Sequence, residues 1–200
     1  MSRLRGSLPS AHSRPLFSPF LLLTNPALRL ILSENTAGKE EFLMSYDKVK
    51  QYFDEAGAGD KVLTFSVSSA TVELAAKAVG CEPARIAKTM SFLTDDGPIL
   101  IVTAGDVKID NHKYKEAFHQ KAKMIPREEV ETDIGHAPGG VCPFAIKDGV
   151  RVFLDDSLKR FDVVYPAAGS ENSAVRLTIP ELEQFSRCHQ WIDVCKTMQA

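Results

Sequence analysis

The residues with the most distinctive chemistry occupy a loop rich in glycine and proline that follows His136. Residues 136–144 read His-Ala-Pro-Gly-Gly-Val-Cys-Pro-Phe. Paired glycines between prolines predict a rigid loop whose backbone can lie close to a ligand, with N–H groups that donate hydrogen bonds to it. A plain turn between two elements is the alternative interpretation. The loop is therefore a candidate ligand-binding segment.

Cys142 in this loop has the residue type of a nucleophile, and His136 is near enough in the sequence to suggest a base. Nearness in sequence does not fix geometry, however, and a small cysteine flanked by Val141 and Phe144 is typical of a protein interior. We favour the buried cysteine and keep the thiol nucleophile as the alternative.

Two further candidates carry positive charge. Lys88 stands at the start of a predicted strand, where its ammonium could point into a cleft; a solvated lysine at a strand end is the alternative. A basic segment between positions 108 and 127 could bind phosphates, or could be a solvated helix face. Its basic residues are Lys108, His112, Lys113, Lys115, Lys121, Lys123 and Arg127, with Tyr114 and Phe118 between them.

Several common signatures are absent from the sequence. It contains no dinucleotide-binding GxGxxG, no P-loop, no GxSxG elbow and no HExxH zinc motif. Its four cysteines form no CxxC pair and have no short spacing to a histidine, which argues against a zinc site. Scattered as they are, they are also too few for a secreted disulfide scaffold. We expect no metal, no cofactor and a reducing compartment.

The composition is that of one globular domain, with 44% hydrophobic and 25% charged residues in a chain of 200. The formal net charge is -2, which excludes a protein that grips nucleic acid with its whole surface. Residues 1–43 hold five basic and three acidic residues, so the remainder carries a net charge near -4. Any nucleic acid must therefore be held by a local basic patch, and we expect neither DNA nor a membrane as a partner.

The first 43 residues differ from the rest of the chain. Arginines are interleaved with serine and proline, no acid occurs before Glu34, and the apolar run 16–23 is interrupted at residues 18 and 19. That run is too short for a membrane span. Three interpretations stay open: an extension upstream of a true start at Met44, an organellar transit peptide or a signal peptide. We expect residues 1–43 to lie outside a domain over 44–200, which is cytoplasmic or, with a transit peptide, organellar.

Capping residues and hydrophobic periodicity place these candidates on an alternating series of elements. Predicted helices cover residues 45–56, 71–79 with Leu74 facing inward, 83–87, 110–119, 126–134 and a stretch that begins at a Thr178–Glu181 capping box. Predicted strands cover 61–66, 88–94, 99–103, 150–154, 162–165, 174–177 and 191–195. Strands outnumber those of a simple doubly wound fold. We predict a mixed α/β fold with a barrel-like mixed sheet surrounded by helices.

Three segments taken together resemble a known family. They are Lys88-Thr89, then Gly139-Gly140-Val141-Cys142-Pro143-Phe144, then Tyr165-Pro166-Ala167-Ala168-Gly169-Ser170. Their order and separation resemble the YbaK/EbsC-type aminoacyl-tRNA deacylases, relatives of the editing domain inserted in bacterial prolyl-tRNA synthetases. The resemblance runs from about Tyr46 to Lys196. It implies a mixed-sheet, barrel-like core with surrounding helices, in agreement with the strand count.

The implied activity is trans-editing, the hydrolysis of the ester that joins a wrong amino acid to tRNA. The resemblance implies mischarged tRNA as partner, with an aminoacyl-tRNA synthetase left open as a second one. It assigns catalysis to Lys88, Gly139 and Gly140. The implied substrate-binding residues are Phe65, Thr89, His136, Val141, Cys142, Pro143, Gly169 and Ser170. The basic segment supplies candidate tRNA contacts at Lys108, Lys113, Lys115, Lys121 and Lys123.

The chemistry of the ester fits this assignment. An aminoacyl ester is already activated, so an enzyme needs to position a water and stabilise the oxyanion, and needs no strong protein nucleophile. In cysteine-specific members of the family the substrate thiol itself attacks. This sequence departs from them at residues 173–175 and at Phe65, which leaves alanyl, seryl and threonyl esters open, with a water ordered by His136. The alternatives are a non-catalytic module that binds tRNA ends or nucleotides, and a Cys142 thiol hydrolase.

Overall fold

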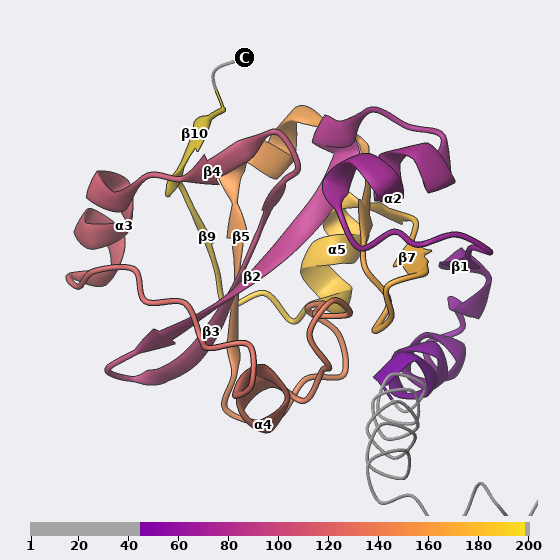
Figure 1. Cartoon of the computed structure of the whole chain (residues 1–200), viewed down its shortest axis with the longest axis horizontal. Coiled ribbons are helices and arrows are strands. Elements are labelled where there is room, and N and C mark those ends of the chain that lie inside the picture. Colours follow the sequence, from indigo (N-terminus) through magenta and orange to yellow (C-terminus); the bar gives the residue numbers. More distant parts are fainter. Residues whose placement is uncertain (1–44, 199–200) are drawn as a thin grey trace, which may run out of the picture. The chain divides into compact units, whose positions relative to one another are not determined.

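The fold is built on a curled six-stranded sheet that forms a half-barrel, seen in a computed structural model that describes residues 45–198 (Figure 1). Its strand order is β8-β6-β2-β3-β5-β9. The strands are β2 (Ile86–Thr94), β3 (Gly97–Ala104), β5 (Arg151–Asp155), β6 (Val163–Pro166), β8 (Leu177–Thr178) and β9 (Gln190–Ile192). The expectations for residues 1–43 lie outside the described residues. The predicted mixed, barrel-like sheet is confirmed.

The centre of the sheet is the hairpin of β2 and β3. A two-residue turn, Asp95-Asp96, joins Thr94 to Gly97, whose φ of 105° is a conformation that suits glycine. Strand β5 then pairs with β3 in parallel, and β6 pairs with β2 in parallel. Because β3 is covered by neighbours on both edges and both faces, its residues 99–102 are a continuous apolar run with no exposed surface.

Two small antiparallel ladders flank this sheet. Strand β1 (Val62–Thr64) pairs with β7 (Ser173–Val175), and β4 (Val107–Ile109) pairs with β10 (Cys195–Thr197). The predicted strand over 174–177 is thus two strands in two sheets, because β7 pairs with β1 whereas β8 pairs with β6. The predicted strand over 191–195 is likewise divided into β9 and β10. Strand β4, three residues long, was not predicted.

Helices surround the sheet, and their ends are set by capping groups. They are a helix over 45–55, α2 (Val72–Val79), α3 (Asn111–Phe118), α4 (Val130–Ile134) and α5 (Ile179–Phe185). The side chains of Thr71 and Asp110 cap α2 and α3, and Thr178 forms a capping box with Glu181 on α5. These predicted caps are confirmed.

Three local predictions were wrong. Leu74 of α2 is 43% exposed, and the neighbouring alanines 75 and 76 fill the inward face instead. The helix predicted from Pro126 begins only at Val130, since the Pro126 carbonyl is used in a turn that accepts the N–H of Glu129. The helix predicted over 83–87 is a single 3-10 turn, η3 (Pro83–Arg85), because Ile86 already pairs with β6.

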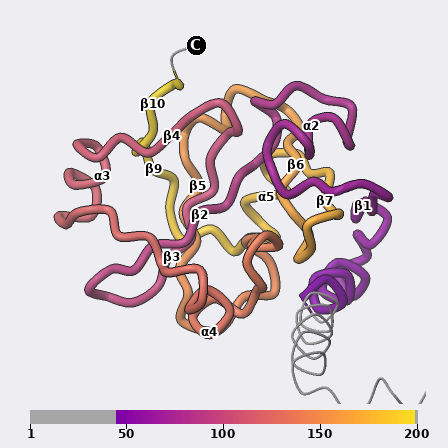
Figure 2. The backbone as a smooth tube through the Cα atoms, viewed as in Figure 1, coloured from indigo at the N-terminus to yellow at the C-terminus, as the bar shows by residue number. Residues whose placement is uncertain are grey.

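Two aromatic clusters lie at different ends of the core. In the first, the ring of Phe53 lies 4.9 Å from that of Phe144 and 5.0 Å from that of Phe185. This cluster fastens the loop after α4 to the helix over 45–55 and to α5, with each ring pair contributing about 1 kcal/mol. In the second, Tyr114 and Phe118 of α3 pack towards Phe92 and Phe153 of the sheet. The tube in Figure 2 shows the long connection between α3 and β5 that passes through α4.

Candidate functional site

The glycine loop touches the segment that follows β6, backbone against backbone. A Cβ atom built on Gly140 would lie 2.6 Å from the carbonyl carbon of Gly169 and 2.9 Å from the nitrogen of Ser170. Gly169 has a φ of 82°, and a Cβ atom on it would lie 2.6 Å from the carbonyl oxygen of Ser45. Only glycine fits at these two positions. The structure therefore brings together two segments that are nearly thirty residues apart in the sequence.

The two neighbouring glycines of this loop play different parts. Gly140 is buried, and its N–H donates to the carbonyl of Ala137 at 3.0 Å. Gly139 is exposed, has a φ of 96°, and has no atom within 4 Å of the place where a Cβ would stand. Gly140 thus fixes the loop on the fold, while Gly139 presents bare backbone on the open side.

His136 is buried behind the loop with no exposed surface. Its Nε2 lies 2.7 Å from the carbonyl oxygen of Phe144. A carbonyl oxygen only accepts, so Nε2 carries the proton, and Nδ1 is the bare nitrogen with no hydrogen-bond partner among residues 45–198. Burial lowers the pKa of His136, which keeps the ring neutral. In this geometry the ring holds the loop, and its predicted role in ordering a water gains no support.

Cys142 lies beside that ring, also without exposed surface. Its Sγ is 3.5 Å from His136 Nε2 and 3.8 Å from the Phe144 carbonyl oxygen. Because Nε2 already bears a proton, it cannot take the proton of the thiol. Burial raises the pKa of the Cys142 thiol to about 12, so the thiolate that a nucleophile requires is absent at neutral pH. The geometry favours the buried cysteine over the thiol nucleophile.

Lys88 lies near the start of β2, opposite Thr103 of β3. Its side chain is half-buried, and its Nζ donates to the carbonyl oxygen of Val107. Burial lowers the pKa of Lys88, an effect that the nearby carboxylates of Asp106 and Glu73 partly offset. Asp106 in turn forms an ion pair with Arg160. The ammonium therefore sits in a partly dry, charged environment where one added anion or dipole has a strong effect.

Sheet pairing links Lys88 to the segment after β6. Ile86 and Ala87 pair in parallel with Tyr165 and Pro166, so Lys88 follows directly on the residues that hold this segment. The three segments that carry the family resemblance thus form one chain of contacts through the fold. In the described part of the chain, however, no hydrogen bond joins Lys88 to Gly139 or Gly140.

The other predicted substrate-binding residues lie in three places. Phe65 and Ser170 meet through Asn172, whose carbonyl accepts from the Phe65 N–H at 2.8 Å and whose Oδ1 accepts from the Ser170 hydroxyl at 2.8 Å. Thr89 lies on the opposite face of β2 from Lys88, and its buried Oγ1 has no hydrogen-bond partner within 45–198. Val141 and Pro143 flank Cys142, with Val141 packed on the core.

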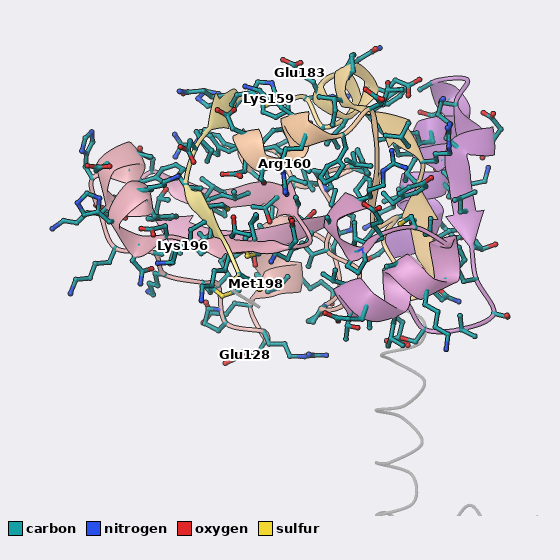
Figure 3. The ribbon with its side chains drawn as sticks, turned by 90° about the horizontal axis from the view of Figure 1, so that it is seen from above. Glu128, Lys159, Arg160, Glu183, Lys196 and Met198 are labelled. Carbon is teal, nitrogen blue, oxygen red and sulfur yellow. The ribbon has the colours of Figure 1, made fainter. Side chains whose placement is uncertain are left out.

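The predicted tRNA-binding lysines lie on and after α3 and on β4, away from the loop. Figure 1 shows α3 at the left of the view, whereas the loop follows α4, at the bottom. The Lys113 ammonium forms an ion pair with Asp193 at 2.7 Å and donates to the Cys195 carbonyl at 2.9 Å, so its charge is already neutralised. The neighbouring Lys196 of β10, labelled in Figure 3, pairs with Asp110 at 2.9 Å. The remaining candidates are exposed: Lys108, Lys115, Lys121 and Lys123.

The contacts that sequence reasoning missed all join distant residues. The Asp106–Arg160 pair and the Asn172 link to Phe65 span 54 and 107 residues. No local signal in the sequence could have found them. Within residues 45–198, no group of three or more His, Cys, Asp or Glu side chains is placed to hold a metal ion, and no helix has the length and apolarity of a membrane span.

The loop, the β6 segment and the strand before them all fall in a stretch that matches one family model. Residues 67–185 match the model described as the aminoacyl-tRNA editing domain. The chain belongs to this family. The editing-domain match covers Lys88, Gly139, Gly140, Gly169 and Ser170, so the resemblance on which those residues were chosen is confirmed at the level of the family.

Individual relatives agree with the editing-domain assignment. The chain is 49% identical over 154 residues to the uncharacterized protein YwhH of Bacillus subtilis (strain 168), covering 76% of this chain and 98% of YwhH. It is 32% identical over 73 residues to a proline--tRNA ligase of the same organism, covering 36% of this chain and 13% of the ligase. A solved structure described as a proposed trans-editing enzyme for prolyl-tRNA synthetase superposes with a TM-score of 0.70 and 28% identity, covering 76% and 97% of the two chains.

Proposed function

We propose that this protein is a trans-editing deacylase, which hydrolyses the ester between a wrong amino acid and the 3′ end of tRNA. Membership of the editing-domain family supports the substrate class. The observation that carries the proposal is the backbone contact between Gly140 and Gly169, next to the β2–β6 pairing that positions Lys88. That arrangement sets bare loop backbone and a half-buried ammonium on connected parts of one fold.

The proposed reaction uses water and no protein nucleophile. The water oxygen attacks the ester carbonyl, the bond to the ribose oxygen breaks, and the products are a free amino acid and tRNA with its hydroxyl restored. Backbone N–H groups of the loop at Gly139 and the Lys88 ammonium stabilise the negative charge that develops on the carbonyl oxygen. On approach of the ester, Lys88 exchanges its neutral partner, the Val107 carbonyl, for this oxygen. Partial burial makes that interaction stronger than it would be in bulk water.

The substrate amino acid is proposed to be alanine, serine or threonine. The family's cysteine-specific members rely on the substrate thiol, and this sequence departs from them at Ser173, Ala174 and Val175. The structure buries all three residues in β7, where they pair with β1. We take mischarged tRNA as the partner, with a synthetase as a second partner to be tested. We further propose residues 44–200 as the domain and the cytoplasm as its location.

The test is a set of tRNAs, each charged with one amino acid and incubated with the full chain. We expect one or more of the alanyl, seryl and threonyl esters on a non-cognate tRNA to lose its amino acid faster than in buffer, with cysteinyl-tRNA unaffected. We expect the amino acid to be released without a lag. We also expect mass spectrometry to find no covalent adduct on the protein. A chain that binds tRNA ends but accelerates no release would contradict the proposal and favour the non-catalytic binding module.

A further inference from the structure

A solvent-open cavity of about 470 Å³ lies beside the glycine loop. Its walls come from Tyr52, from the segment 143–152 and from the turn 185–189 after α5. Pro143 belongs both to this wall and to the glycine loop. Gly139 is four residues from Pro143, so the open side of the loop is at most about 14 Å away along the chain. The cavity therefore adjoins the candidate site.

The charge of this cavity is mainly positive. Lys147, Arg151 and Arg187 line it together with His189, against the single carboxylate of Asp148. The Lys147 ammonium donates to the neutral carbonyl of Thr132. Arg151 forms a loose ion pair, at 3.6 Å, with Asp96, whose side chain is 80% exposed, and it donates to Thr94 Oγ1 at 3.4 Å. Three cations therefore gather at this cavity in a domain with a net charge near -4, although exposed lysines also lie on and after α3.

Arg187 is the least neutralised of these cations. Its guanidinium carbon lies 5.8 Å from the centre of the Tyr52 ring, and no ion pair involves it within residues 45–198. Its backbone has a φ of 49° at the C-terminal end of α5, a left-handed position that glycine occupies with less strain. An arginine at a position where the backbone favours glycine points to a role for the side chain.

We propose that this cavity binds backbone phosphates near the acceptor end of the tRNA while the glycine loop holds the ester. Exposed Arg and Lys side chains around an open cavity are suited to phosphodiester oxygens. Its volume admits more than a single phosphate group. The basic segment at α3 is less suited, since Lys113 and the neighbouring Lys196 are neutralised by Asp193 and Asp110. The inference rests on the proposed function for its choice of RNA.

The experiment measures binding of uncharged, fluorescently labelled tRNA to the full chain by anisotropy, between about 50 and 200 mM salt. Arg187→Glu is expected to weaken binding roughly tenfold or more and to make the slope of log K against log salt shallower by about 1. Lys77→Glu is the matched control, because it reverses one exposed charge on α2, outside the cavity. It should change binding by less than about twofold.

A second variant separates a binding role from a structural one. Arg187→Gly removes the charge and relieves the left-handed backbone, so the melting temperature should rise by about 2 °C while tRNA binding weakens. If Arg187 had only a structural role, Arg187→Gly would lower the melting temperature and weaken tRNA binding together. Equal binding and equal salt slopes for Arg187→Glu and Lys77→Glu would overturn the proposal.

The same measurements separate this inference from the proposed function. Uncharged tRNA has no ester, so its binding does not depend on catalysis. Loss of binding in Arg187→Glu, with a wild-type chain that deacylates nothing, would support the cavity and contradict the deacylase. Unchanged kcat/KM and binding in Arg187→Glu, with an active wild type, would contradict the cavity alone.

Discussion

Lys88 and the loop over residues 139–144 belong to one candidate site, yet the fold holds them in opposite ways. The loop is fixed by tight packing and a buried hydrogen bond. Gly140 lies against Gly169, the ring of His136 donates to the carbonyl of Phe144, and the ring of Phe144 packs on Phe53. Lys88 is a flexible side chain with one hydrogen bond to a neutral carbonyl. The shape of the loop is therefore set before any ligand arrives, whereas the charge of Lys88 can be redirected towards a ligand.

The sharpest test of the movable charge is Lys88→Ala. It should lower kcat/KM for a mischarged tRNA by roughly a hundredfold or more, about 3 kcal/mol, the effect typical of losing one oxyanion donor. Lys88→Arg should also fail, because a planar guanidinium does not replace a compact ammonium in a tight site. Single-turnover deacylation measures both. An active Lys88→Ala beside an inactive Cys142→Ala would reverse our interpretation of the site.

The fixed shape is tested by alanine at each glycine of the loop. At Gly140 the new methyl group would overlap the backbone of residues 169 and 170, so we expect a loss of about 2 kcal/mol in the free energy of unfolding. At Gly139 the space is open and only the positive φ is unfavourable, so the loss should be about 1 kcal/mol. Urea titrations of the two variants give both values. Equal losses would mean that the contact with Gly169 is not tight.

Cys142→Ala probes the buried cysteine of the loop. It removes one sulfur atom from a fully buried position, so we expect about 1 kcal/mol of destabilisation and activity within a few-fold of the wild type. Because burial raises the pKa of this thiol to about 12, iodoacetamide at neutral pH should leave activity intact and the Cys142 peptide unmodified. Peptide mass spectrometry and a parallel activity assay check this. Abolished turnover or an acyl-enzyme adduct would support the thiol hydrolase.

The smallest effect concerns His136 and pH. Burial lowers its pKa below the ordinary 6.5, so under mildly acidic conditions the unfolded chain binds a proton that the native chain does not. The free energy of unfolding should therefore fall as the pH drops from about 6.5, by up to roughly 1 kcal/mol per pH unit until the lowered pKa is reached. His136→Gln should flatten this slope, measured as urea midpoints at several pH values. The exposed His119→Gln serves as control and should keep the wild-type slope.

Features that depend on neighbouring residues could be predicted from the sequence. The caps at Thr71 and Asp110, and the turn between β2 and β3, each rest on groups a few residues apart. Hydrophobic alternation located most strands for the same reason. The family resemblance assigned the glycine loop and the segment after β6 to one substrate site, which no local pattern contains.

Features that depend on distant partners could not be predicted. The stretch over 173–178 serves two sheets because β1 and β6 reach it from different directions. Lys113 looked like a free cation in the sequence, but Asp193, 80 residues later, neutralises it. Arg187 was not singled out at all, since its left-handed backbone and its place in the cavity wall appear only in three dimensions.

The stacking of Gly140 on Gly169, and of Gly169 on Ser45, also limits how this fold can change its substrate over evolutionary time. A side chain at Gly140 would displace residues 169 and 170, and one at Gly169 would displace residues 45 and 46. New preferences for an amino acid must therefore arise from substitutions around the loop, such as at Phe65 or Ser173, while the loop itself stays constant. A library that varies those two positions should yield altered specificity, and one that varies Gly140 or Gly169 should yield mainly destabilised chains.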